Sequence, residues 1–431
     1  MGDDTRLDQY KQIVKGLSDR IVQAQRPIRI LDSIKWDAGI QAAFFANGCT
    51  EPPPVGPDYY ARRPLPFEPA QVRLEFEDIA HDIRRNLGQF NPLAKIMERM
   101  CREYCDVVRL IEARGQPEFS KISQQLYGSS SDAFHAGDPS LADMAVLLSD
   151  TLANASRDVT AEADPKDISS EEAVTVLEAR LEAYFRDADQ TVRVKLSDGI
   201  LSDAAAGADY IKLRTDARFS QRDLRLLEIH EGWVHLGTTI NGLRQPVCTF
   251  LSKGPPSSTV TQEGLAMLME IFCFASHPAR VRRLTDRIHG VQMAEQGANF
   301  IEVFRFFQDN GYSEQDSYNH SVRVFRGSTP DNGPFTKDLV YSKGFVLIYN
   351  YIQLAVRRGV PSRTQLLFCG KTTLEDVRTL ADLVAEGLVE PPRFLPPQIA
   401  DLAALTAWMC YSNFLNRLDL KRIESDYAAI L

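Results

Sequence analysis

The chain has 431 residues, of which 44% are hydrophobic and 25% are charged, and its formal net charge is −9. A soluble globular protein of this length can bury a large core, and we expect it to contain two domains. The acidic balance excludes a general nucleic-acid-binding surface, because such a surface needs a basic stripe that neutralises phosphates. We therefore expect no nucleic-acid partner.

Targeting and membrane-spanning segments are not expected. The segment MGDDTRLDQYKQIVKGLSDR has two acids where a signal peptide needs basic residues, and it lacks an apolar core, so we expect a cytoplasmic protein. The most hydrophobic run, 339–356, is interrupted by Lys343 and Asn350, which favours a buried helix over a membrane span. The seven cysteines contain no Cys-x-x-Cys pair and are typical of reduced, buried thiols. The oligomeric state stays open.

The first part of the chain is predicted to be helical with one interruption. Helical patterns occupy most of 4–47 and then recur over 70–87 and 92–114, where apolar residues follow a helical spacing. Seven prolines within 49–69 exclude a helix through that segment and indicate an extended crossing. We predict an N-terminal helical domain over 1–164 that contains this Pro-rich crossing.

A second domain is predicted over 165–431. The residues Ser-Ser-Glu-Glu at 169–172 are typical of a capped helix start. Two short runs with alternating apolar residues follow at 191–197 and 208–214, and such runs are typical of strands. Because the patterns are helical almost throughout from 259 onward, the expected fold class is mainly α with a small β component (α+β).

The stretch LLEIHEGWVHLG, 226–237, places His230, Glu231 and His235 close together. Histidines five residues apart lie about 140° apart around a regular α-helix, so they can share an ion only if the helix is underwound or carries a π-bulge. Gly232 inside the motif lowers helix propensity and marks a possible weak point. From this spacing alone, a metal site and a buried helix with two incidental histidines are equally open.

A metal site would need a third protein ligand, and the segment TVTQEGLAMLMEIF, 259–272, supplies the natural candidate. Glu263 lies on the first turn of the predicted helix, and Glu270 lies on the same face. Glu263 could bind the ion, while Glu270 could accept a hydrogen bond from an imidazole N–H behind it. The alternative for these carboxylates is a stabilising interaction with the helix dipole.

Three ordered segments together carry a resemblance to a known family. HEGWVHLGTTINGLRQP, TQEGLA and RVFRGSTPDNGPFTKDLVYSKGF resemble the QEGLA-motif family of zinc metallopeptidases, which is related to the microtubule-associated tyrosine carboxypeptidases. The resemblance covers residues 165–360 well and the first domain only loosely. It implies a helical zincin-like catalytic domain, with one helix bearing the HExxxH motif and a second, downstream helix bearing a glutamate.

Site roles also follow from the resemblance. It implies Zn²⁺ held by His230, His235 and Glu263, with Glu231 as the general base. Zinc bound by two imidazoles and one carboxylate lowers the pKa of bound water from 15.7 to about 7, and Glu231 can then pass the proton to the leaving amine. The chain departs from the family at Trp233, where small residues are usual, so the shape of the substrate pocket is in doubt.

Further polar residues are candidates for binding substrate. Tyr341 and Lys337 are candidates for stabilising the oxyanion, with Tyr341 assigned a catalytic role. Arg323 and Arg326 are three residues apart, and we predict that one of them binds a substrate carboxylate, although a solvated basic face explains each of them equally well. Gln245 is a further candidate for lining the cleft.

The leading hypothesis is a zinc metallopeptidase that cleaves a peptide or amide bond near the carboxyl terminus of a peptide or protein substrate. One alternative is a protease that matures a peptide precursor and cuts in another direction. A second alternative is a binding or regulatory protein that keeps the metal without catalysis. Two histidines and one carboxylate also bind Fe(II), so the identity of the metal rests on the helical context and the adjacent glutamate.

Overall fold

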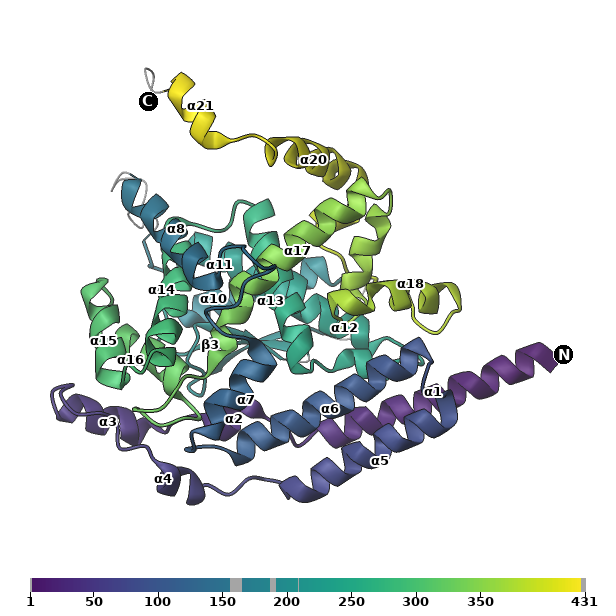
Figure 1. Cartoon of the computed structure of the whole chain (residues 1–431), viewed down its shortest axis with the longest axis horizontal. Coiled ribbons are helices and arrows are strands. Elements are labelled where there is room, and N and C mark those ends of the chain that lie inside the picture. The colour runs from purple at the N-terminus through teal and green to yellow at the C-terminus, as the bar shows by residue number, and fades with distance from the viewer. Residues whose placement is uncertain (1, 156–164, 187–190, 208, 428–431) are drawn as a thin grey trace.

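The computed structural model describes residues 2–155, 165–186, 191–207 and 209–427. Helices dominate this part of the chain, and one small sheet accompanies them (Figure 1). The predicted fold class, mainly α with a small β component, is therefore confirmed.

The amino-terminal part is built from helices, and the longest of them lie along one edge of the molecule (Figure 1). Three long helices, α1, α5 and α6, pack side by side there (Figure 1). The elements up to the sheet are α1 (Gly2–Gln25), α2 (Ile30–Ile34), α3 (Ala38–Ala46), α4 (Pro57–Ala61), α5 (Pro69–Leu87), α6 (Pro92–Glu112), α7 (Glu118–Tyr127), α8 (Leu141–Asn154) and α10 (Ser170–Tyr184). The α10 helix starts with a capping box between Ser169 and Glu172, as the sequence predicted.

The Pro-rich segment 49–69 is extended except for one helical turn. That turn is α4, and its first residue is Pro57. Proline suits this position because its fixed φ fits the first turn of a helix and its missing N–H would have no partner there. The prediction of an uninterrupted extended crossing was therefore wrong at 57–61, although no helix runs through the whole segment.

The sheet has three short strands in the order β1-β3-β2. Strands β1 (Arg193–Ser197) and β3 (Tyr210–Arg214) were predicted, and they pair in parallel. Strand β2 (Ala204–Ala206) pairs antiparallel with β3 and forms an edge of the sheet. The sequence did not predict β2, because alanine has low strand propensity and three residues show no alternation.

The remaining elements continue the helical architecture and end in α20, which packs on α17, and α21, which extends away from the body (Figure 1). Some of the short ones are 3₁₀ or π-type turns, which carry η labels. They are α11 (Gln221–Leu227), η1 (Glu228–Leu236), α12 (Gly237–Leu243), η2 (Thr249–Ser252), α13 (Pro256–Phe272), α14 (Pro278–Glu295), α15 (Phe300–Asp309), α16 (Glu314–Phe325), η3 (Thr336–Leu339), α17 (Val340–Arg357), η4 (Pro361–Phe368), η5 (Leu374–Asp376), α18 (Val377–Ala385), α19 (Pro397–Ala400), α20 (Leu402–Leu415) and α21 (Leu420–Tyr427).

The segment Thr336–Arg357 is long and apolar enough to cross a membrane by length and composition. It packs against α13 on one side and α20 on another, as the core helix of a globular protein does.

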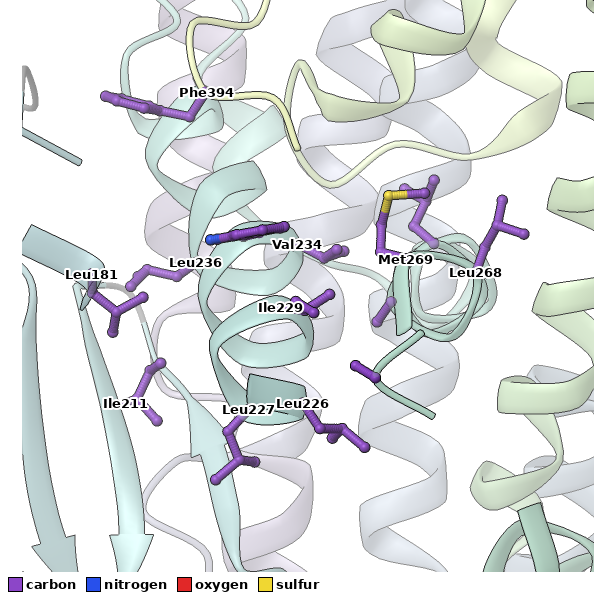
Figure 2. Close-up of a cluster of buried hydrophobic side chains, with 14 of the residues drawn as sticks. Leu181, Ile211, Leu226, Leu227, Ile229, Val234, Leu236, Leu268, Met269 and Phe394 are labelled. Atoms are coloured by element: carbon purple, nitrogen blue, oxygen red, sulfur yellow. The ribbon is translucent and has the colours of Figure 1, made fainter. Parts of the chain in front are cut away.

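Helix η1 lies between the sheet and α13. Figure 2 shows Ile211 of β3 and Leu181 of α10 on one side of it, and Leu268 and Met269 of α13 on the other. Apolar side chains, including the buried Ile229, thus pack on both sides of η1. This packing fixes how the helix is rotated about its own axis and therefore which way its polar side chains face.

The predicted division into domains 1–164 and 165–431 borders on residues 156–164, which lie outside the described residues. In the described part, the core beneath α1, α5 and α6 also contains Phe250 of η2 and Leu380 of α18. Chain segments from both sides of the predicted boundary thus share one core. The two-domain division stays a prediction.

Helices α13 and α17 cross at two glycines. A Cβ atom added to Gly264 would lie 2.7 Å from the Cα of Gly344, and it would overlap the carbonyl group of the same residue. The glycine of the Gln-Glu-Gly-Leu-Ala motif is therefore required by a close helix crossing, one residue from Glu263.

Replacing Gly264 with alanine should destabilise the protein by about 1 to 3 kcal/mol, because the added methyl group meets backbone that cannot rotate away. Urea unfolding measures this effect. The matched control is Gly16→Ala in α1, where nothing lies within 4 Å of the added Cβ, and where alanine should stabilise by about 0.5 to 1 kcal/mol. Equal stability of the Gly264→Ala variant and the wild type would contradict the tight crossing.

Candidate metal centre

Three side chains from two helices bring one ligand atom each to a common point. The Nε2 atoms of His230 and His235 lie 3.2 Å apart. The Oε2 atom of Glu263 lies 3.2 Å from the His235 nitrogen and 3.4 Å from the His230 nitrogen. Ligand atoms about 2.0 to 2.1 Å from a tetrahedral zinc ion are about 3.3 to 3.4 Å apart, so the triangle matches one face of such a coordination shell.

The π-helical form of η1 explains how histidines five residues apart can meet. The segment Glu228–Leu236 is π-helical between two α-helical segments, as the spacing of the motif required. Hydrogen bonds from residue i to i+5 widen the turn, so residues five apart return to the same face. The preceding helix α11 begins at a Ser220–Asp223 capping box. Gly232 lies inside η1, where a Cβ would overlap Leu181.

Glu270 holds the ring of His230 from behind. Its Oε1 atom accepts a hydrogen bond from Nδ1 of His230 at 2.6 Å, which leaves Nε2 directed at the ligand triangle. Arg280 donates to both oxygens of Glu270, at 2.9 and 3.2 Å. Burial would raise the pKa of Glu270, but the charge of Arg280 and the bond from His230 outweigh it and lower the pKa to about 2. The carboxylate therefore stays ionised beside the imidazole.

The ligand residues themselves are strongly coupled. Burial would lower the pKa of His230, but hydrogen bonds to Glu263 and Glu270 raise it to about 10 in the metal-free protein. Burial would raise the pKa of Glu263, but His235 and His230 hold it well below its usual range. The pocket thus contains a concentrated set of basic nitrogens and an ionised carboxylate, which is the donor set that divalent metals bind.

Glu231 lies beside the triangle without belonging to it. Its Oε1 atom is 4.0 Å from Nε2 of His230. Its Oε2 atom accepts a hydrogen bond of 2.8 Å from the backbone N–H of Ala206 in the edge strand β2. The strand that sequence patterns missed thus orients this carboxylate and leaves its second oxygen next to the ligand atoms.

Tyr341 and Lys337 lie close to two of the three candidate ligand residues. The ring of Tyr341 is 6.3 Å from the ring of His230 and nearly parallel to it. Burial and the charge of Glu263 raise the pKa of Tyr341, so its hydroxyl is a neutral donor. The Nζ atom of Lys337 lies 3.6 Å from Oε1 of Glu263, the oxygen that does not join the triangle.

These residues line a cleft of about 1270 Å³ that also contains a group of arginines. Arg323 makes two hydrogen bonds of 2.7 Å to Asp338 and is thereby neutralised. The Nε atoms of Arg287 and Arg326 are buried and have no hydrogen-bond partner among the described residues. Burial and the charge of Arg323 lower the pKa of Arg287 to about 9 and that of Arg326 to about 10. Both values leave the two groups charged at neutral pH.

Three basic residues of the site were not identified from the sequence. Arg280 and Arg287 both line the cleft from α14, with Arg283 between them at helical spacing, and that periodicity was an available signal. Lys371 has no such signal, because it follows η4 in a loop far along the chain. Its Nζ atom bonds to the carbonyl oxygen of His235, and burial lowers the pKa of Lys371 to about 7 despite the charges of Glu263 and Glu231.

One sequence expectation needs correction, and one question that the sequence left open has an answer in the structure. Gln245 does not occur among the described residues that line the cleft, and its side chain bonds instead to the backbone of Cys369 and Glu390. Its amide therefore holds two chain segments together and is not free to bind substrate. Trp233 lies in the core, stacked on Tyr184 at 5.4 Å, with Arg225 over its ring at 4.6 Å. Trp233 does not occur among the described residues that line the cleft, so the departure from the family at this position lies in the core.

Comparison with protein families gives a match to one family model, described as microtubule-associated tyrosine carboxypeptidase, over residues 42–417. The match extends beyond 165–360, the region that the sequence motifs covered, and takes in most of the amino-terminal helices. A comparison with curated proteins found no match. Because the family model covers most of the chain, this protein belongs to the microtubule-associated tyrosine carboxypeptidase family.

Proposed function

We propose that this protein is a zinc-dependent metallopeptidase that removes a residue from the carboxyl terminus of a peptide or protein, with Glu231 as the general base. Membership of the family implies peptidase activity of the carboxypeptidase type. The observation that carries the finer proposal is the ligand triangle with edges of 3.2, 3.2 and 3.4 Å, with a free carboxylate beside it in an open cleft.

The donor set supports zinc and a catalytic site. Structural zinc sites are usually closed by four protein ligands, whereas catalytic sites have three and keep a position open for water. Zinc held by His230, His235 and Glu263 would supply Lewis acidity, which lowers the pKa of a bound water molecule to about 7 and polarises a carbonyl group.

Glu231 is the residue that can move the proton. As the water oxygen forms a bond to the carbonyl carbon, Oε1 of Glu231 accepts the proton that this water loses. The same carboxyl group then donates the proton to the leaving nitrogen as the C–N bond breaks. The products are a free amine and a carboxylic acid, which releases its remaining proton to solvent and becomes a carboxylate, and Glu231 returns to its ionised form. The hydrogen bond from Ala206 keeps the carboxylate in place through both transfers.

Tyr341 is the candidate donor for the oxygen that becomes negative during this reaction. Its raised pKa keeps the hydroxyl protonated, and its ring lies against that of His230. Lys337 also lines the cleft and adds positive charge next to Glu263.

The buried arginines support a carboxypeptidase direction. A substrate with a free carboxyl terminus brings one negative charge into the cleft. There Arg326 has no carboxylate partner among the described residues, and Arg287 has only a 3.9 Å contact with Asp338, the carboxylate that Arg323 binds with two hydrogen bonds. A guanidinium group binds a carboxylate with two parallel hydrogen bonds. We therefore propose that Arg326 and Arg287 bind the substrate's terminal carboxylate. Arg323 binds Asp338 and does not contact the substrate in this proposal. The family's description makes tyrosine the first terminal residue to test.

The experiment compares two forms of one peptide that ends in tyrosine, the free acid and the carboxyl-terminal amide. The zinc-loaded protein should release tyrosine from the free acid and react much more slowly with the amide. Arg326→Met should raise KM for the acid by about 10- to 100-fold, because a charge-assisted pair is worth about 1.5 to 3 kcal/mol, and should leave the reaction with the amide unchanged.

The matched control is Arg282→Met, which removes one positive charge from an exposed residue that lines the same cleft. This variant should behave as the wild type does. Cleavage at internal bonds with no preference for a free terminus would favour the precursor-maturing protease. Metal binding without any cleavage would favour the binding or regulatory protein.

A further inference from the structure

Lys371 approaches the metal centre from a loop that is firmly held in the fold. Its backbone N–H donates a 2.7 Å hydrogen bond to the carbonyl oxygen of Leu251 in η2. The preceding residue is Gly370, where a Cβ atom would lie 2.7 Å from the Cβ of Leu251. The loop is therefore pressed against η2, and this close contact fixes where the Lys371 side chain begins.

The Lys371 side chain connects the two helical segments that carry the metal ligands. Its Nζ atom donates to the carbonyl oxygen of His235 at 2.8 Å, to Oγ1 of Thr238 at 2.9 Å and to Oε1 of Gln262 at 2.9 Å. His235 belongs to η1, Thr238 to α12, and Gln262 directly precedes the ligand Glu263 in α13. The Nζ atom thus has three oxygen acceptors within hydrogen-bond distance.

The same network contains a direct contact between α13 and α12, the helix that continues directly from η1. Oγ1 of Thr238 donates to Oε1 of Gln262 at 2.7 Å, so Thr238 and Lys371 converge on one amide oxygen. The carbonyl oxygen of His235 also accepts a bond of 2.7 Å from Thr239. The carbonyl group of His235 and the side chain of Gln262, which directly precedes Glu263, are thus held by one cluster of hydrogen bonds.

We propose that Lys371 is a positioning residue of the metal centre, which ties η1 to α13 and so sets the separation between the His235 and Glu263 ligand atoms. Glu270 orients His230 through its ring, whereas Lys371 orients His235 through its backbone. The inference rests on the proposed function, because it needs the ligand triangle to bind a metal. It concerns a residue that touches no ligand atom directly.

The test compares the metal affinity of the wild type, Lys371→Met and Lys15→Met. Methionine keeps the length of the lysine chain but removes all three donors. Lys15→Met is the matched control, because it removes the same charge from a surface pair with Asp19 on α1. Zinc affinity is measured by competition with a chromophoric chelator, and the visible spectrum of the Co²⁺-loaded protein reports the coordination geometry. Thermal unfolding of the metal-free proteins is measured alongside.

Lys371→Met should weaken zinc binding by about 10- to 100-fold, as the loss of an outer partner of a ligand typically does, and it should change the Co²⁺ spectrum. Lys15→Met should change neither. If Lys371→Met is too unstable to purify, Thr238→Val removes one hydroxyl from the same network and should shift both readouts in the same direction. Unchanged zinc affinity and an unchanged Co²⁺ spectrum in Lys371→Met, or in Thr238→Val if it is used instead, would overturn the inference. If only the thermal stability fell, Lys371 would stabilise the fold without positioning the metal ligands. A wild type that binds no zinc would instead overturn the proposed function.

Discussion

Replacing Glu231 with glutamine should reduce kcat by about 10²- to 10⁴-fold while zinc stays bound, since a positioned general base contributes a factor of that size. Glutamine has the same shape and can still accept the N–H of Ala206 through its amide oxygen, so the local structure should persist. It cannot take a proton from water. Metal content by elemental analysis and release of the terminal residue are measured on the same sample.

Glu263→Ala is the informative comparison, because it removes the proposed ligand atom that lies 3.2 Å from the His235 nitrogen. It should lose both metal and activity, whereas Glu231→Gln should lose activity alone. Metal loss in both variants would place Glu231 among the ligands. A Glu231→Gln protein with near-normal kcat would exclude this carboxylate as the base.

Replacing Asp338 with asparagine should destabilise the protein by about 3 to 5 kcal/mol, the range for breaking a buried ion pair by removing one partner. Asp338 receives two hydrogen bonds from Arg323, and a nitrogen of Arg287 lies 3.9 Å away. Without the carboxylate, several buried positive charges remain with little compensation. Urea unfolding at pH 7 measures the loss. The control is Asp132→Asn, which breaks a more exposed pair with Lys343 and should cost no more than about 1 kcal/mol.

The effect of Asp338→Asn should also depend on pH. Burial would raise the pKa of Asp338, but Arg323 and Arg287 outweigh it and hold the pKa below its usual range. A carboxyl group with a lowered pKa stabilises the folded state above the unfolded pKa of about 3.9, and this stabilisation is lost as the pH falls below that value. The stability difference between wild type and variant should therefore be constant from pH 7 to about 5 and should shrink below pH 4. A difference that grows in acid would contradict the assignment of this ion pair.

Local features of the molecule followed from the sequence because their causes lie within a few residues. The Ser169 and Ser220 caps need only a hydroxyl and an acid three positions later. The π-helix was required by the spacing of His230 and His235, provided that both bind one ion. Strand β2 was not predicted because its cause is not local. Its three alanines carry no pattern of their own and pair only because β3 lies beside them.

What the sequence determined by itself is the helical class, the caps and the residue types at the ligand positions. Only the tertiary structure decided that Glu263 meets the histidines, that Asp338 neutralises Arg323 while Arg326 is left without such a partner, and that Lys371 reaches the carbonyl of His235. The physical reason is that these contacts join elements far apart in the chain, and their distances depend on how helices pack. One such crossing, at Gly264 and Gly344, lies next to a ligand and is visible in the sequence only as two glycines.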